Sequence, residues 1–256
     1  MKKRITIDGG AVVYVLEHPV RERGDSEKVR AAKSKATSQA QQLRNQILSI
    51  RQLELLLSVN FPTPGSGLVC CLSFDDDHLP KTRREAQRRF KYFLKKLRAE
   101  RKAAALPEPR VIYSPEVLTS SSGRWHYHIV LDSTGDDLDM LRRCWIYGSD
   151  IEATPLRVDL EKNHETQARY MSKELREAQE YDSKPGLHGW SCTRSCRRPE
   201  VDEQIVEDSR KLRAPRGATV LIHERRSTEL TESVLLKYRL PARCFTPRAR
   251  ARRRRR

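Results

Sequence analysis

An apolar run followed by a strongly amphipathic segment constrains the fold of this chain more than any other feature. Leu68–Phe74, within GLVCCLSF, is continuously apolar over a length that suits a buried strand better than a helix. Between Lys81 and Lys102, apolar residues recur at spacings of three and four, and most other positions are Arg or Lys. The inner face of this predicted helix consists of Ala86, Phe90, Phe93, Leu94 and Leu97. A sheet covered by helices is therefore expected.

The rest of the chain alternates between similar signals. A helix is predicted from Thr37 to Ser58, before the prolines and glycines of NFPTPGSG, with the apolar stripe Leu43, Ile47, Ile50, Leu53 and Leu57. Arg110–Leu118 and Arg124–Leu131 read as a strand pair across the turn TSSSG. The remaining expected elements are a helix at Asp137–Trp145, a strand near Thr154–Leu160, a helix from His164 to about Gln179 with Asn163 as its N-cap, a strand within LHGWSCTRS and an edge strand in ATVLIHE. This order predicts an α+β fold whose mostly antiparallel sheet of about five strands is flanked by helices.

The same signals divide the chain into four parts. Residues 1–33 mix glycine, charge and one short apolar patch, AVVYVLEHPV, and are interpreted as a flexible lead-in. Residues 34–215 form the expected main domain, 216–245 a C-terminal extension, and 246–256 an Arg-rich tail that is expected to be disordered.

Positive charge is the strongest compositional signal. The chain carries 51 Lys and Arg against 34 Asp and Glu, a formal charge of +17. The surplus remains when the seven arginines of the final TPRARARRRRR are set aside, which favours a polyanionic partner, and nucleic acid above all. The predicted backbone contacts are Arg84, Arg88, Lys91, Lys95, Arg194, Arg197 and Arg198. Such contacts give affinity but little sequence choice, and a merely solvated charged face is the alternative for the helix.

Other classes of protein are disfavoured. The sequence has no apolar stretch of the roughly 18 residues that a membrane span requires, and no secretory signal is expected because MKKRITIDGG lacks an apolar region. Its six cysteines show no paired C-x-x-C spacing of the kind that binds zinc. This favours free thiols in the cytoplasm of a bacterial host. There is no phosphate-binding G-x-x-x-x-G-K-[ST] motif, so DNA unwinding would need a separate helicase.

The sharpest chemical feature is His126-Tyr127-His128 within the predicted strand RWHYHIVL. Side chains two apart on a strand share a face, so the imidazoles project together while Tyr127 points the other way. Two imidazoles on one face suit a divalent metal ion, and a carboxylate is the natural third ligand. Glu116 is the candidate because a hairpin could bring it alongside; the rivals are Asp75, Asp76 and Asp77 at the end of the first strand.

Tyr170 and Lys173, in ARYMSKELRE, share one face of the predicted helix that follows. A tyrosine hydroxyl is a poor nucleophile at neutral pH, and a nearby cation or a metal-bound phosphate lowers the barrier to its attack. A Y-x-x-K pair alone is weak evidence of function. Its place on a helix after a strand that carries H-x-H is more informative.

The array CLSF, HYH and YMSK resembles motifs I, II and III of the HUH endonucleases, and in particular the rolling-circle replication initiators of plasmids and small single-stranded DNA phages. The likeness covers roughly residues 37–200, and the sequences around the motifs, VNF, LSFDDDHLP and WSCTRSCRRP, also resemble that family. It implies an RRM-like nuclease fold and a place for the chain in rolling-circle DNA replication.

The resemblance also implies roles for individual residues. His126, His128 and Glu116 would bind Mg²⁺ or Mn²⁺, Tyr170 would be the nucleophile, and Lys173 would position the phosphate. No small-molecule cofactor is implied; the partners would be single-stranded origin DNA, a host helicase and a DNA polymerase. Relatives with two catalytic tyrosines carry the second four residues after the first, where this chain has Glu174, and Tyr181 stays open as a partner. A relaxase, a tyrosine transposase or a non-enzymatic DNA-binding protein are the alternatives, and Trp125 or Trp190 could stack on bases.

Overall fold

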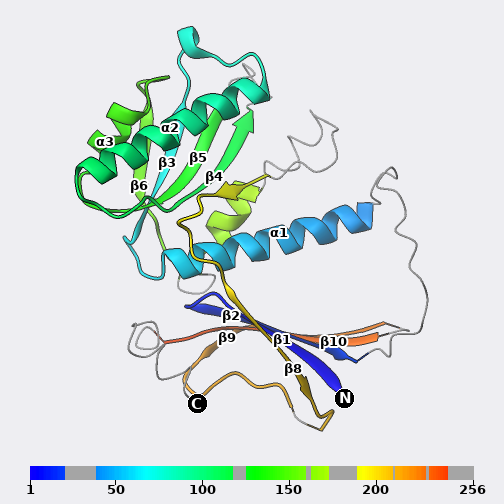
Figure 1. The fold of residues 1–256 in the computed structure, drawn as a ribbon. Helices are drawn as coiled ribbons and strands as arrows, with labels where there is room; N and C mark the ends of the chain where they lie inside the picture. The colour runs from blue at the N-terminus through cyan, green and yellow to red at the C-terminus, as the bar shows by residue number, and fades with distance from the viewer. Residues whose placement is uncertain are drawn as a thin grey trace. The chain divides into compact units, whose positions relative to one another are not determined.

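The computed structural model describes residues 1–20, 39–117, 125–159, 163–172, 189–209, 211–228 and 231–241. The chain divides into two compact units (Figure 1). The first contains residues 1–59, 161–163 and 198–256, and the second contains residues 60–160 and 164–197. Each unit is built on its own antiparallel sheet of five strands, so the chain has the α+β class that its sequence predicts.

The sheet of the second unit has the order β6-β3-β5-β4-β7. Its strands are β3 (Gly67–Ser73), β4 (Val111–Val117), β5 (Trp125–Asp132), β6 (Ile151–Pro155) and β7 (Ser191–Cys192). All neighbouring strands in it are antiparallel. β5 is the central strand, with β3 on one side and β4 on the other, so the predicted strand pair is confirmed.

Helix α2 (Arg83–Ala103) follows the short 3-10 helix η1 (Asp76–His78) and begins at a defined cap. The Thr82 side chain accepts a hydrogen bond from the Glu85 amide, and the Glu85 carboxylate accepts one from the Lys81 amide. These bonds satisfy backbone donors that an uncapped helix would leave exposed. The predicted inner face is confirmed, since Ala86, Phe90, Phe93, Leu94 and Leu97 are all buried.

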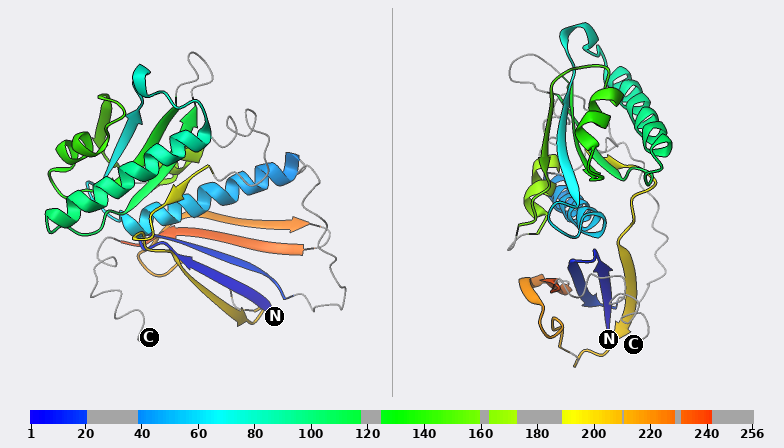
Figure 2. Two further views of the ribbon diagram at one scale, coloured as in Figure 1. Left: turned by 45° about the horizontal axis from the view of Figure 1, so that its top comes forward. Right: turned by 90° about the vertical axis from the view of Figure 1, so that its left-hand side faces the viewer.

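One face of this sheet forms an apolar core with α2 and with α3 (Asp137–Cys144), which lie together on that side (Figure 2). Tyr127, Ile129 and Leu131 of β5 contribute alternate side chains to the core, as the period of a strand requires. At the far end of β5, Arg101 of α2 donates to Asp132 at 2.8 Å and is itself fully buried. Apolar packing and a buried ion pair therefore hold α2 on this face.

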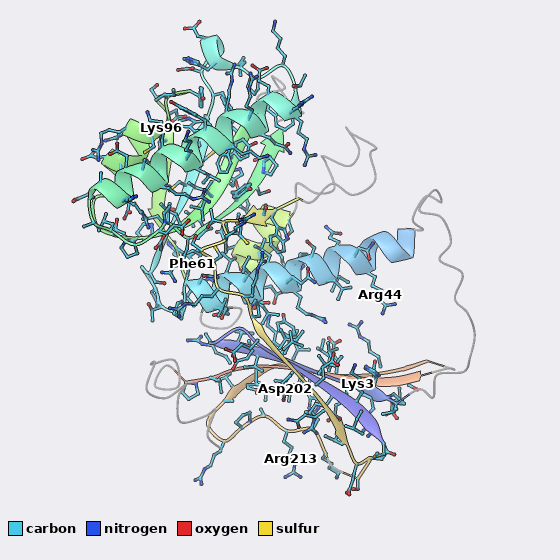
Figure 3. The ribbon with its side chains drawn as sticks, viewed as in Figure 1. Lys3, Arg44, Phe61, Lys96, Asp202 and Arg213 are labelled. Carbon is cyan, nitrogen blue, oxygen red and sulfur yellow. The ribbon has the colours of Figure 1, made fainter. Side chains whose placement is uncertain are left out.

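The sheet of the first unit has the order β8-β1-β2-β10-β9. Its strands are β1 (Lys2–Asp8), β2 (Val12–Pro19), β8 (Glu200–Val206), β9 (Thr219–Thr228) and β10 (Thr231–Arg239). The edge strand expected in ATVLIHE is β9, which confirms that prediction. On the opposite edge, Lys3 of β1, labelled in Figure 3, lies 2.7 Å from the Glu203 carboxylate of β8.

Helix α1 (Gln39–Asn60) packs on this first sheet through both apolar and charged contacts. Leu55 joins a buried cluster with Val12 and Leu235. The buried Glu54 carboxylate accepts a hydrogen bond from the Tyr14 hydroxyl at 2.7 Å and lies 2.9 Å from the Lys237 ammonium. A buried charge is tolerated when it is paired and hydrogen-bonded, as this one is.

The interpretation of residues 1–33 as a flexible lead-in is wrong for residues 1–20, which form β1 and β2. Gly10 adopts φ 82° in the turn between them, a conformation that glycine takes without strain. The domain limits differ as well, because β9 and β10 belong to the same sheet as β1 and β2 rather than to a separate extension. Residues 21–33 and the Arg-rich tail lie outside the described residues.

Three smaller expectations also need correction. Leu43 and Ile47 of the predicted α1 stripe are exposed, because only the later part of the helix is packed. β6 begins at Ile151 rather than near Thr154, since its pairing with β3 starts there. Asn163 has φ 56° instead of the extended backbone of an N-cap, and its side-chain atoms make no hydrogen bond within the described residues.

Within the part of the chain that the structure describes, no helix combines the length and the apolar character needed to cross a membrane.

Candidate active site

The two imidazoles lie on the face of the second sheet that α2 does not cover. Between them, Tyr127 points into the core, where its ring stacks on Phe90 with centroids 4.0 Å apart and planes 9° apart. His126 and His128 therefore both project to the opposite face. His126 of β5 is the register partner of Ser73 on the neighbouring strand β3, and its Nδ1 atom lies 3.2 Å from the Ser73 hydroxyl.

Glu116 lies beside the imidazoles, on the neighbouring strand β4. It is in register with His126, so His128 is its diagonal neighbour across the strand pair. One oxygen of its carboxylate lies 2.5 Å from Nε2 of His128. Both side chains are largely buried, at 18% and 9% exposure, so the contact is shielded from water. The structure thus brings together the three side chains that the sequence analysis proposed as metal ligands.

Tyr170 reaches the same place from a helix formed by residues 165–172. Two contacts hold this helix: the Ser114 hydroxyl of β4 lies 3.0 Å from the Met171 carbonyl and 2.7 Å from that of Gly189, and a ring nitrogen of His164 lies 2.8 Å from the Phe61 carbonyl. Ser114 projects from the same face of β4 as Glu116, two residues away. The helix is therefore held against the imidazole face of the sheet.

The Tyr170 hydroxyl lies 3.5 Å from Nε2 of His128, and the two rings meet edge to face with centroids 5.1 Å apart. Tyr170 is 49% exposed, and its hydroxyl lies next to the imidazole. The other residues that the motif invoked, Lys173 and Tyr181, lie outside the described residues.

The two tyrosines nearest the imidazoles differ in chemistry. Burial raises the pKa of the Tyr127 hydroxyl well above its ordinary value of 10.0, and the nearby Tyr113 hydroxyl acts in the same direction. Tyr127 is therefore held in its neutral form inside the core, away from any substrate. Tyr170 alone of the two is placed to reach a molecule bound at the imidazole face.

The donor set suits a divalent cation in kind: two imidazoles and one carboxylate are ligands that Mn²⁺ and related ions accept. The Ser73 contact to Nδ1 of His126 resembles the outer contacts that orient metal-binding histidines. In the described ranges, however, no group of three or more His, Cys, Asp or Glu side chains has the arrangement of a formed metal site. Instead, the Glu116 carboxylate and the His128 imidazole contact each other directly.

Of the rival carboxylates, Asp76 and Asp77 are exposed in η1, and Asp75 contacts another group. Asp75 lies 2.6 Å from Nδ1 of His78, beside η1, and both side chains are substantially exposed. Trp125 packs against the apolar core on the α2 face, which supports its alternative interpretation as a core residue. Trp190 is half-buried.

The predicted DNA contacts lie in two places. Arg84, Arg88, Lys91 and Lys95 are exposed on α2, on the face of the sheet opposite Tyr170. Arg194, Arg197 and Arg198 follow β7 and are also exposed. Arg197 is fixed through its backbone, because its amide donates to the Asn60 side chain at 2.9 Å. Within the described residues, none of these side chains forms a hydrogen bond or an ion pair with the imidazole site.

Sequence reasoning missed the two serines that support the site. Ser73 and Ser114 both occupy positions that a period of two assigns to the imidazole face, one on each strand beside β5. The register between the strands would have revealed them, but a sequence without known pairing does not supply that register.

Compared with protein-family models, curated proteins and solved structures, the chain gives no significant match. The case for a function therefore depends on the residues and the geometry described above.

Proposed function

We propose that this protein is a metal-dependent DNA endonuclease and strand transferase of the HUH type, acting as a rolling-circle replication initiator. The observation that carries the proposal is the 3.5 Å separation between the Tyr170 hydroxyl and Nε2 of His128. Two motifs separated by 42 residues thereby converge on one face of one sheet.

His126, His128 and Glu116 are the residues that would hold Mg²⁺ or Mn²⁺. Binding requires the Glu116 carboxylate to exchange its contact with His128 for the ion. When bound, such an ion offsets negative charge on the scissile phosphate. Ser73 and the strand register keep the imidazoles in place before any substrate arrives.

Tyr170 supplies the nucleophile. Its oxygen attacks the scissile phosphorus, forming a tyrosyl O–P bond while the bond from phosphorus to the 3′ oxygen breaks. The phenolic proton passes to water, and the departing 3′ oxygen takes up a proton to become a free 3′-OH. The product is a 5′-phosphotyrosine, and the reverse reaction rejoins the ends because the ester retains the energy of the phosphodiester.

The surrounding protein would position the strand. Lys173 follows Tyr170 by three residues and would place a cation next to the phosphate. The 3′-OH would be extended by a DNA polymerase, and a host helicase would unwind the duplex. The free cysteines of the described residues suit the bacterial cytoplasm, where we place this activity.

A covalent adduct tests the proposal directly. Wild-type protein is incubated with Mn²⁺ and single-stranded oligonucleotides from candidate origins, and a denaturing gel reveals any protein–DNA adduct. We expect wild type to form the adduct, Tyr170→Phe to form none, and EDTA to abolish it. Tyr92→Phe is the matched control, because Tyr92 is 45% exposed on α2, away from the site. The proposal fails if no strand yields an adduct, or if Tyr170→Phe forms it as well as wild type.

The alternatives make different predictions. A conjugative relaxase or a tyrosine transposase would share the adduct and would be distinguished by the neighbouring genes and by a hairpin next to the cleavage site. A non-enzymatic DNA-binding protein is favoured only by the charge of +17. It predicts DNA binding with no adduct, and no effect of Tyr170→Phe on any activity.

A further inference from the structure

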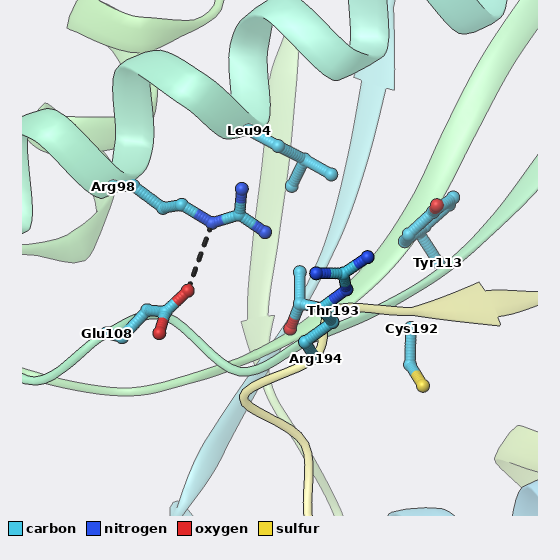
Figure 4. A pocket seen from close by; sticks show the side chains of 7 residues that line it. All are labelled: Leu94, Arg98, Glu108, Tyr113, Cys192, Thr193 and Arg194. Atoms are coloured by element: carbon cyan, nitrogen blue, oxygen red, sulfur yellow. Dashed lines mark ion pairs between the residues drawn. The ribbon is translucent and has the colours of Figure 1, made fainter.

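A surface hollow of about 370 Å³ lies beside α2 (Figure 4). Its lining residue Tyr113 packs against the apolar core on the α2 face of the second sheet, which is the face opposite Tyr170. Arg98 and Leu94 of α2 form one side, and Tyr113 of β4 and Arg194 form the other. Figure 4 shows that the side chains of Arg98 and Arg194 both extend into this space. Nothing in the proposed cleavage chemistry uses these residues.

The hollow is the end of a longer row of positive charge. Arg98 continues a series on α2 at alternating spacings of four and three, which places its members on one face of the helix. The series is Arg84, Arg88, Lys91, Lys95 and Arg98. Its 14-residue span corresponds to about 21 Å of helix, which is long enough to follow several phosphates of a single strand.

One carboxylate partly neutralises the positive charge of the hollow. Glu108 lies 3.2 Å from the Nε atom of Arg98, and both side chains are about half exposed, at 58% and 44%. This contact uses one side of the guanidinium, so its remaining donors can bind another anion. Arg194 makes no ion pair within the described residues. Two guanidinium groups facing one hollow indicate an anionic occupant.

The wall of the hollow is aromatic and apolar. The Tyr113 ring packs on Phe90 with centroids 4.6 Å apart, which fixes its orientation while leaving it half-buried. Leu94 and Cys192 complete the apolar surface. A flat ring beside two cations fits a nucleotide, whose base stacks and whose phosphate pairs with arginine. An acidic peptide would use the cations but would bring no base to stack on the ring.

We propose that this hollow binds one nucleotide of single-stranded DNA whose backbone follows the basic row of α2. Tyr113 stacks on the base, and Arg98 and Arg194 contact its phosphate. The identity of the partner rests on the proposed function. Because the hollow and Tyr170 lie on opposite faces of the sheet, this contact contributes affinity for the strand and takes no part in bond breaking.

Binding of full-length protein to a fluorescent oligo-dT strand tests the proposal, with Tyr170→Phe present throughout to prevent cleavage. We expect Arg98→Gln, Arg194→Gln and Tyr113→Leu each to weaken binding about 10-fold. Tyr113→Phe keeps the ring and should bind within about 2-fold of the parent. Each of the two arginine variants should also reduce the magnitude of the slope of log affinity against log salt concentration by about one.

Arg226→Gln is the matched control for lost charge, since Arg226 is 65% exposed on β9 of the other unit. Thermal unfolding of Tyr113→Leu separates loss of binding from loss of fold, and the exposed arginine variants carry the test if that variant unfolds. The proposal is overturned if the hollow variants bind DNA like Arg226→Gln, or if poly-Glu competes as well as DNA. Adduct formation by wild type is a separate measurement, so failure of either proposal can be recognised without the other.

Discussion

The two faces of the second sheet are built from the same strands but have opposite chemistry. On the α2 face, Tyr127 stacks on Phe90 in an apolar core. On the other face, His128 contacts Glu116 and Tyr170, and the tyrosine is half exposed. The period of two along β5 makes this division possible, because neighbouring residues serve different faces. Stability and chemistry should therefore be separable by mutation, and four variants test that separation in order of their expected effect on unfolding.

Phe90→Ala should have the largest effect on stability. Phe90 is 1% exposed and contacts Phe93, Tyr113 and Tyr127, so its removal leaves a cavity at the centre of the core. We expect the free energy of unfolding in urea to fall by about 3–5 kcal/mol. Tyr92→Ala, an exposed position on the same helix, should change it by no more than about 0.5 kcal/mol. Equal effects of the two variants would show that the α2 face is not the stabilising one.

Asp137→Asn should have an intermediate effect, because buried charge at the far end of β5 serves the fold. Burial alone would raise the pKa of Asp137, but hydrogen bonds from Thr134, Gly135 and Ser133 together lower it below its ordinary value of 3.8. The carboxylate also lies 3.4 Å from the buried Arg101 guanidinium. We expect a loss of about 1–3 kcal/mol at neutral pH.

The pH dependence of this loss has a definite sign. A carboxyl with a lowered folded pKa contributes stability above its unfolded pKa, and that contribution is lost as the pH falls through the folded value. The difference between wild type and Asp137→Asn should therefore be constant near neutral pH and shrink below about pH 4. Asp139→Asn on the same helix, with a side chain 74% exposed, is the control. A difference that grows in acid would contradict this account.

His128→Ala should cost little stability and much activity. The loss of its contact with Glu116 should lower the free energy of unfolding by about 1 kcal/mol. Adduct formation should require about 10- to 100-fold more Mn²⁺, because one proposed ligand is gone. A titration of adduct yield against Mn²⁺ gives this value, and an unchanged titration would remove His128 from the metal site.

Tyr170→Phe should have the smallest effect on folding. The residue is 49% exposed, so removal of its hydroxyl should change the free energy of unfolding by less than about 0.5 kcal/mol. Adduct formation should nevertheless fall by at least about 1,000-fold, since the reacting oxygen is missing. A large loss of stability in this variant would mean that the tyrosine serves the fold, and the contrast between the two faces would disappear.

The second unit was predictable because its signals are local. The spacing of Phe90, Phe93 and Leu97 identified α2, and the apolar run identified β3. The sheet of the first unit was not, because β1 pairs with β8 across some 200 residues and six of the seven residues of β8 are exposed. The local signals in this unit were the helical pattern that predicted α1, the apolar patch AVVYVLEHPV and the strand pattern in ATVLIHE. None of these signals indicates that strands from both ends of the chain pair in one sheet.

Part of the candidate site was predictable, because the spacing of residues in a strand motif determines which side chains share a face. His-x-His on a strand fixes a shared face, and a hairpin makes Glu116 its neighbour. The approach of Tyr170 depends on the Ser114 contact that anchors its helix, which no spacing in the sequence encodes. Nor does the sequence indicate that Glu116 and His128 contact each other directly.

The position of Tyr127 in the core fixes the register of β5 in this sheet. With its ring locked against Phe90, β5 cannot slide along its partners by a single position without exchanging the environments of a phenol and two imidazoles. Insertions and deletions within this strand should therefore be far less tolerated than substitutions, since each would invert inside and outside at once. Natural variation or directed evolution of the protein should leave the length of β5 unchanged even where its residues differ.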